Sequence, residues 1–266
     1  MANLPGWKFL RNLVQRRTLL FQLVRRDFQQ RFVGSAAGWL WGVIHPLVLL
    51  LSWTFVFQIC LKVHPPGIEH YTLFLFCGFL PWLLFQETVS RSASSLLEHS
   101  NLITKTLFPA EVVPVSVFLS ALIHHLIGLV LAVAAVAIVL RQVSPMIAFL
   151  PIYMFLVGLF SIGLGWIVSS LNVYLRDTAQ VLNVALTLWF WATPIFISEQ
   201  QIPRRFRFVV NSNPLSFVVR AYRERLMTDR WPNLAELAII ATYASCVFVL
   251  GGLFFRYLKR GFADVL

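Results

Sequence analysis

The sequence predicts an all-α membrane protein with six transmembrane helices. Hydrophobic residues make up 58% of the 266 residues and charged residues only 12%, and the mean hydropathy is +0.75, far above that of soluble domains. Six apolar runs are close to the length needed to cross the hydrocarbon core of a bilayer. We expect spans at 36–61, 71–90, 112–140, 146–173, 179–198 and 235–258, all within a single transmembrane domain, residues 1–266.

The segment before the first span, residues 1–34, is basic and amphipathic. It carries seven basic residues against Asp27, and the tail 259–266 is also basic, so the positive-inside rule predicts that both termini are cytoplasmic. No signal-peptide pattern precedes the first span. One helical face combines Leu10, Leu13, Val14, Phe21, Val24 and Phe28. We expect this helix to lie on the inner membrane surface among lipids; the alternative is a basic tail that only sets topology.

The connection between the second and third spans predicts a short cytoplasmic helix near 96–108. It contains Leu102, Ile103, Leu107 and Phe108 before Pro109, and serines precede it as candidate caps. An amphipathic helix in water exposes these apolar residues unless a partner's groove covers them. The pattern therefore predicts a docking element.

Few ionisable residues fall inside the spans: His45, Glu87, His124 and His125. A carboxylate in a span is costly, so we expect Glu87 to face protein or the inner headgroup region rather than lipid. The histidines have no evident partner in the sequence, which argues against a proton relay.

The fifth span holds three consecutive large aromatics, Trp189, Phe190 and Trp191, followed by Pro194. They lie deeper than the interfacial belts where tryptophan is enriched, and Trp82 of the second span is at a similar depth. Aromatic faces stack on sugars without holding them by charge. We expect these four residues to line a substrate path; the alternative is packing between helices.

The segment 198–234 is external in this topology although it contains seven arginines. Residues 213–227 can form a short helix with an apolar side, and Arg220, Arg223 and Arg225 lie elsewhere on it. Its arginines are expected to meet anionic headgroups, or alternatively diphosphate and acidic sugars.

The sequence contains no catalytic or nucleotide-binding motif. None of its lysines follows a glycine in a phosphate-binding loop, and nucleophile elbows, zinc-protease motifs and catalytic acid pairs are absent. Cys60, Cys77 and Cys246 lack metal or disulfide spacing. We expect a chain that is not an enzyme by itself, with no catalytic residues, no metal and no cofactor of its own.

Six motifs in order resemble one family over nearly the whole chain: "FVGSAAGWLWGVIHPLVLL" (32–50), "FLFCGFLPWLLFQ" (74–86), "NLITKTLFPAEVVPV" (101–115), "LNVYLRDTAQVL" (171–182), "LWFWATPIF" (188–196) and "NPLSFVVRAYRE" (213–224). They are similar to the membrane permeases of polysaccharide-exporting ABC transporters, the Wzm and TagG type. The resemblance implies a homodimer that joins two nucleotide-binding ATPase subunits, which hold ATP and Mg, and exports an undecaprenyl-diphosphate-linked glycan.

The resemblance also implies roles for particular residues. The helix that carries Arg220, Arg223 and Arg225 would dip into the membrane at the outer mouth as a re-entrant external gate. Residues 7–31 would form the interface helix, and a coupling helix would dock into the ATPase through Asn101, Leu102, Ile103, Lys105, Leu107 and Phe108. The cytoplasmic entrance is assigned to Trp39, Trp41, Arg176 and Asp177.

We therefore expect a permease for lipid-linked, O-antigen-like polysaccharide in the cytoplasmic membrane of a bacterium, in contact with membrane lipids and not with nucleic acid. Export of capsular polysaccharide or teichoic acid is the first alternative. A permease for a small hydrophobic molecule would have a narrower cavity with fewer tryptophans at mid-depth, and a lipid-modifying enzyme would have clustered catalytic polar groups, which are not found.

Overall fold

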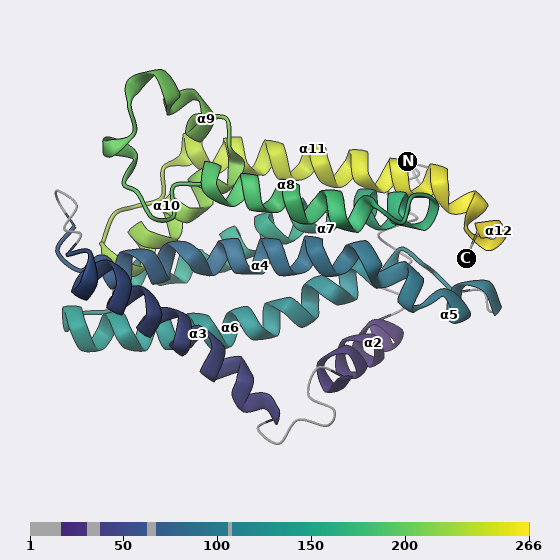
Figure 1. Ribbon diagram of the computed structural model, residues 1–266, viewed down its shortest axis with the longest axis horizontal. Helices are drawn as coiled ribbons and strands as arrows, with labels where there is room; N and C mark the ends of the chain where they lie inside the picture. The colour runs from purple at the N-terminus through teal and green to yellow at the C-terminus, as the bar shows by residue number, and fades with distance from the viewer. Residues whose placement is uncertain (1–16, 31–37, 63–67, 106–107, 266) are drawn as a thin grey trace.

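The computed structural model describes residues 17–30, 38–62, 68–105 and 108–265, and every regular element in these ranges is a helix (Figure 1). Five helical stretches are long and apolar enough to cross a membrane: Trp41–Cys60, Tyr71–Glu98, Val112–Leu140, Pro145–Tyr174 and Leu234–Gly261. The predicted all-α, multi-span class is therefore confirmed for the described part of the chain.

Helix α4 (Tyr71–Glu98) is the centre of the bundle. It packs against α6 (Val112–Leu140), α7 (Leu150–Tyr174) and α10 (Pro214–Met227), and α11 (Leu234–Leu258) packs against α7. Of the 28 residues of α4, 18 are buried, whereas Pro46 is the one buried residue in the helical part of the first span. Protein therefore surrounds α4, whereas the first span lies at the edge of the protomer, as Figure 1 shows.

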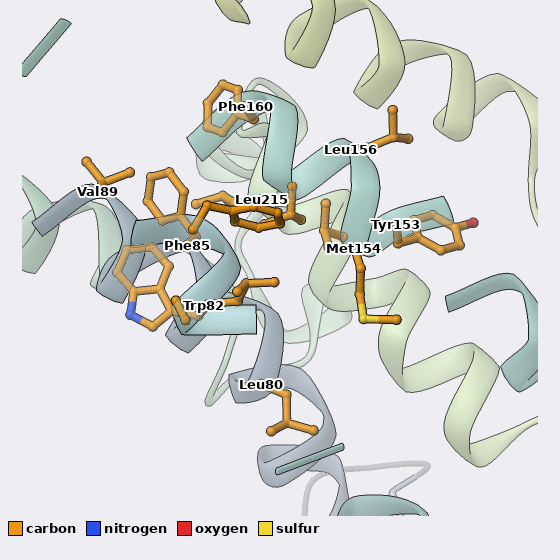
Figure 2. Packing of buried hydrophobic residues seen from close by; sticks show 14 of the residues in the cluster. Leu80, Trp82, Phe85, Val89, Tyr153, Met154, Leu156, Phe160 and Leu215 are labelled. Atoms are coloured by element: carbon orange, nitrogen blue, oxygen red, sulfur yellow. The ribbon is translucent and has the colours of Figure 1, made fainter. Parts of the chain in front are cut away.

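The core is built from side chains of α4, α7 and α10 (Figure 2). Phe85 is fully buried and stacks on Phe160 of α7, with ring centroids 5.7 Å apart. One turn along α7 from Phe160, a Cβ added to Gly251 of α11 would collide with the backbone of Gly163. Small residues at a crossing let membrane helices approach closely, so this glycine pair sets the α7–α11 contact.

The first span is an irregular helix. Helix α3 (Trp41–Trp53) contains Pro46 and passes into a π-helical stretch, Thr54–Cys60. Its exposed side chains are mostly apolar, as expected of a helix that meets lipid or another subunit: Leu47, Val48, Leu51, Phe55, Val56 and Ile59.

The fifth predicted span is shorter than expected. Helix α8 (Thr178–Ala192) has 15 residues, or about 22 Å at 1.5 Å per residue, and ends six residues before the predicted boundary at 198. The cause is Pro194, which excludes helical backbone from the residue before it, and Thr193 is extended (φ −96°, ψ 130°). The six-span layout stays a prediction, with α8 as its fifth member.

Only the second half of the predicted interface helix lies within the described residues, as α2 (Arg17–Gln30). Leu10, Leu13 and Val14 lie outside them. Leu23 is buried where α2 packs on α6, whereas Phe21 is 68% exposed. Because Phe21 points away, the face that docks on the bundle centres on Leu23 rather than on Phe21.

The short helices are found at opposite ends of the bundle (Figure 1). One end carries α5 (Ser100–Lys105) and α12 (Phe262–Val265), and the other carries α9 (Arg207–Asn211) and α10. Helix α4 continues beyond the predicted end of its span at 90 to Glu98, and a break at His99 starts α5. The predicted coupling and gate segments are thus on opposite sides, as their assignment requires.

Candidate functional site

The four aromatics predicted to line a path gather in one cluster between α4 and α8. The ring of Phe190 lies 5.4 Å from that of Trp82 and 5.3 Å from that of Trp191, and Phe85 contacts Trp189 at 5.1 Å. Phe196, from the segment after α8, joins Trp191 at 5.7 Å. The structure therefore brings together all four residues that the sequence singled out.

The members of this cluster differ in exposure. Trp82 is 1% exposed, and its Nε1 donates to Gln86 Oε1 at 2.6 Å. Trp189 is half-buried against the core, and its Nε1 donates to Asn213 Oδ1 at 2.9 Å. Trp191 is 70% exposed. Within the protomer, Trp82 and Trp189 pack with both indole N–H groups satisfied, and Trp191 presents an accessible ring surface.

The irregular segment after α8 is held by side chains of α4 and α10. Asn213 caps α10 by accepting from Leu215 N at 3.0 Å, and its amide donates to Thr193 Oγ1 at 2.9 Å. Tyr71 Oη, at the start of α4, donates to the Phe196 carbonyl at 2.7 Å. Carbonyls freed by the end of α8 thus find donors within the protein, as buried backbone groups require.

Arg223 of α10 donates hydrogen bonds to two carbonyls of the segment after α8 and to one carbonyl of α4. It is 9% exposed and donates from Nε to the Phe74 carbonyl at 3.0 Å, from Nη1 to the Pro194 carbonyl at 2.8 Å, and from Nη2 to the Ile195 carbonyl. Its guanidinium also lies 3.5 Å from the centroid of the Phe74 ring. A Cβ on Gly78 would sit 2.5 Å from Nη2, so this position of α4 admits the guanidinium only as glycine. We call Gly78, Arg223 and the three carbonyls the arginine clamp.

The other two arginines of the predicted gate also have partners inside the protomer. Arg220 binds Glu199 through two hydrogen bonds of 3.0 and 2.6 Å, and Glu236 at the start of α11. Burial lowers the pKa of Arg220, but Glu199 and Glu236 raise it more, so the pKa lies above its ordinary value and the ion pairs stay charged. Arg225 is 1% exposed and binds Glu224 and the Arg230 carbonyl. The gate role of Arg220, Arg223 and Arg225 stays a prediction; in the protomer they brace α10 rather than face outward.

The predicted coupling residues lie around α5. Asn101 is exposed, and Leu102 is half-buried. Ile103 and Phe108 are also half-buried, and both pack against the core. Leu107 and the side chain of Lys105 lie outside the described part of the chain. The coupling role is untested and stays a prediction.

Of the predicted entrance residues, Arg176 and Asp177 lie at the same end, whereas Trp41 lines a cavity with Glu87 of α4 and His124 of α6. Trp41 is 52% exposed at the start of α3, while the side chain of Trp39 is outside the described part. Arg176 and Asp177 are exposed in the turn between α7 and α8, where the Asp177 carbonyl accepts from Gln180 N and Val181 N, both at 3.0 Å. Their position fits an entrance, and the assignment stays a prediction.

Sequence reasoning missed Asn213, Tyr71, Gly78 and Gln86. Asn213 is followed by Pro214, and asparagine at the N-cap with proline at the first helical position is a typical helix start. The sequence alone could therefore have indicated that Asn213 is a cap. Tyr71 and Gly78 contact residues that are distant in the sequence, and Gln86 accepts from the buried indole of Trp82. No local sequence pattern indicates these roles.

Comparisons with known proteins agree with the architecture. The family model described as ABC-2 type transporter matches residues 18–227. The chain is 28% identical over 251 residues to the O-antigen export system permease protein RfbA of Klebsiella pneumoniae, covering 93% of this chain and 95% of that protein. It is 27% identical over 259 residues to the protein of the same name from Myxococcus xanthus, covering 97% and 98%. Because the family model spans most of the chain, including α2 to α10, this protein belongs to the ABC-2 type transporter family.

Proposed function

We propose that the chain is the membrane permease of an ATP-driven exporter that moves lipid-linked, O-antigen-like polysaccharide across the cytoplasmic membrane. The family supports the transport role, and the relatives named as O-antigen export permeases support the substrate. The structural observation that most directly supports a path for sugars is a polar stripe on the exposed side of α8.

This polar stripe consists of Gln180, Asn183, Thr187 and Trp191, all exposed or half-exposed and spaced by three or four residues along one side of α8. Ser90 of α4 extends it, since its Oγ donates to Asn183 Oδ1 at 3.3 Å. Polar side chains that face hydrocarbon are costly and rare. The stripe therefore suits a water-filled path, where amides and hydroxyls exchange hydrogen bonds with sugars and Trp191 offers a stacking surface.

One protomer presents this stripe on an open side, so a closed path needs a second copy. A homodimer with α8 of both copies facing a shared lumen would enclose it, and the apolar residues beside the stripe, Val181, Val184 and Leu188, would meet lipid or the partner. In this arrangement α8 is the fifth of six spans, and both chain termini are cytoplasmic.

Energy for transport would come from two ATPase subunits that bind ATP and Mg. The end of the bundle that carries α5 would dock on them, with Leu102 in a groove of the ATPase and the entrance residues Arg176 and Asp177 beside it. The external end would open through α9 and α10, whose position depends on the arginine clamp.

Reconstituted transport tests the proposal. The permease and its ATPase are placed in proteoliposomes, and ATP-dependent movement of undecaprenyl-diphosphate-linked glycan is followed by its protection from an added glycosidase. We expect protection that requires ATP and disappears with an ATPase variant unable to hydrolyse it. Transport of capsular or teichoic acid polymer alone, or of a hydrophobic dye without glycan, would overturn the substrate assignment.

A further inference from the structure

A cavity of about 260 Å³ lies between α3, α4 and α6, away from the polar stripe of α8. It brings together the ionisable residues that the sequence places within the spans: His45 of α3, Glu87 of α4, and His124 and His125 of α6. His125 is buried, with its Nε2 3.0 Å from Tyr222 Oη, so it belongs to the wall. His45, Glu87 and His124 remain as the polar groups at the opening.

The cavity changes from polar to apolar along the bundle axis. On α4, Glu87 lies three residues beyond Leu84 and seven beyond Leu80, which is about 4.5 and 10.5 Å closer to the end that carries α5. On α6, His124 lies one turn closer to that end than Gly128, whose added Cβ would be 2.9 Å from Leu80. The polar groups therefore share one level, and Leu80, Leu84 and Gly128 line the deeper part. Such a gradient fits an amphiphile rather than a free sugar or ion.

The polar end presents both signs of charge. Glu87 Oε1 lies 3.9 Å from His124 Nδ1 and 3.8 Å from Arg91 Nη1. Arg91 also pairs with Asp27 of α2, and the ring of Phe28 on α2 lies 5.5 Å from that of His124. A purely anionic headgroup would meet the Glu87 carboxylate, whereas a head with a phosphate beside an ammonium matches both partners.

We propose that this cavity binds the headgroup of an aminophospholipid of the phosphatidylethanolamine type. The ammonium donates to Glu87, the phosphate accepts from the imidazoles of His45 and His124, and the first acyl carbons lie along Leu80 and Leu84. Because the His124 ring also contacts Phe28 of α2, and Arg91 joins Glu87 to Asp27 of α2, the bound lipid holds α2 against α4 and α6. Trp41, which is assigned to the cytoplasmic entrance, also lines the cavity, but no residue of α8 does, so the lipid site does not depend on the polar stripe or on the identity of the transported substrate.

Native mass spectrometry of the purified permease–ATPase complex tests the site. The complex is delipidated in mild detergent and titrated separately with phosphatidylethanolamine, phosphatidylcholine and phosphatidylglycerol. We expect retention of about one phosphatidylethanolamine per permease, with at least a tenfold preference over phosphatidylcholine, which lacks N–H donors, and over anionic phosphatidylglycerol. The variant Glu87→Gln should lose most of this preference. Glu98→Gln, at the last residue of α4 and bonded to Ser94 outside the cavity, is the matched control and should keep it.

Other outcomes would overturn the proposal. Equal retention of the three lipids, or an unchanged preference in Glu87→Gln, would show ordinary annular lipid. Displacement of phosphatidylethanolamine by undecaprenyl diphosphate in the parent complex, lost in Glu87→Gln, would assign the cavity to the substrate lipid instead. Thermal unfolding of each variant without added lipid should show that Glu87→Gln is folded, because the Glu87 side chain is 28% exposed and its replacement leaves the core intact.

Discussion

The arginine clamp predicts that Gly78→Ala and Arg223→Ala have strongly coupled effects on stability. In an unconstrained helix interior, replacing glycine with alanine is favourable by about 1 kcal/mol. In α4 the added Cβ would lie 2.5 to 2.7 Å from three atoms of the Arg223 guanidinium, so the guanidinium must shift. Overpacking of this kind costs about 1–3 kcal/mol. We therefore expect Gly78→Ala alone to destabilise the permease.

Arg223→Ala removes the donors of the Phe74, Pro194 and Ile195 carbonyls and should cost about 1–3 kcal/mol for each carbonyl that is left without a partner. It also removes the guanidinium with which a methyl group at position 78 would collide. In this background Gly78→Ala should be neutral or slightly stabilising, which gives a coupling energy of about 1–3 kcal/mol.

Equilibrium unfolding of the four proteins in mixed micelles measures this double-mutant cycle. Gly128→Ala is the matched control, because its added Cβ would meet the flexible end of Leu80 rather than Arg223. It should cost the same in the parent protein and in the Arg223→Ala background. If Gly78→Ala has equal effects in the two backgrounds, the guanidinium does not occupy the space beside Gly78 and the clamp is refuted.

Three further predictions concern other contacts. Gly251→Val should separate α7 from α11 and lower the melting temperature of the purified permease by several degrees. Gly252→Val should lower it less, because the nearest neighbour of an added Cβ there is the Trp166 ring at 3.5 Å. Equal shifts in melting temperature would contradict the close crossing of α7 and α11. Leu102→Asp should leave the permease inserted but reduce co-purification of the ATPase and ATP-dependent export, and normal binding and export would remove α5 from the coupling interface. Leu23→Ala should weaken the contact of α2 with the bundle, which would be measured as faster proteolysis between α2 and α3. Phe21→Ala should not have this effect, because Leu23 is buried and Phe21 is exposed. Faster proteolysis in Phe21→Ala than in Leu23→Ala would place Phe21 at the contact.

Hydropathy and periodicity were sufficient to predict the five stretches that are long and apolar enough to cross a membrane, because lipid imposes length and composition on each segment separately. The same local signals predicted α10 and the aromatics of α8. They did not predict where α8 ends, although Pro194 and its restriction of Thr193 were visible; the aromatic run suggested a continuous span.

Contacts between distant segments were not predictable. Arg223 reaches Phe74, 149 residues away in sequence, so its role depends on how α10 packs on α4. Trp82 was expected at a path and lies in the core, since depth along a helix does not reveal which side faces the lumen. Likewise the histidines His45 and His124 had no evident partner in the sequence, because the cavity that they line with Glu87 forms only when three helices meet.

The central claim is that the exposed side of α8 lines the glycan path, while Trp82 packs inside the protomer. Single alanine variants at Trp191 and Trp82 test it directly when ATP-dependent glycan export and thermal stability are measured on the same reconstituted preparations. We predict that Trp191→Ala reduces export of long glycans with little change in melting temperature, since its side chain is 70% exposed. Trp82→Ala should lower stability by about 3–5 kcal/mol, the range for a buried aromatic, and lower export only in proportion to the folded protein. Full export by Trp191→Ala, or a selective loss of export by stable Trp82→Ala, would contradict the account.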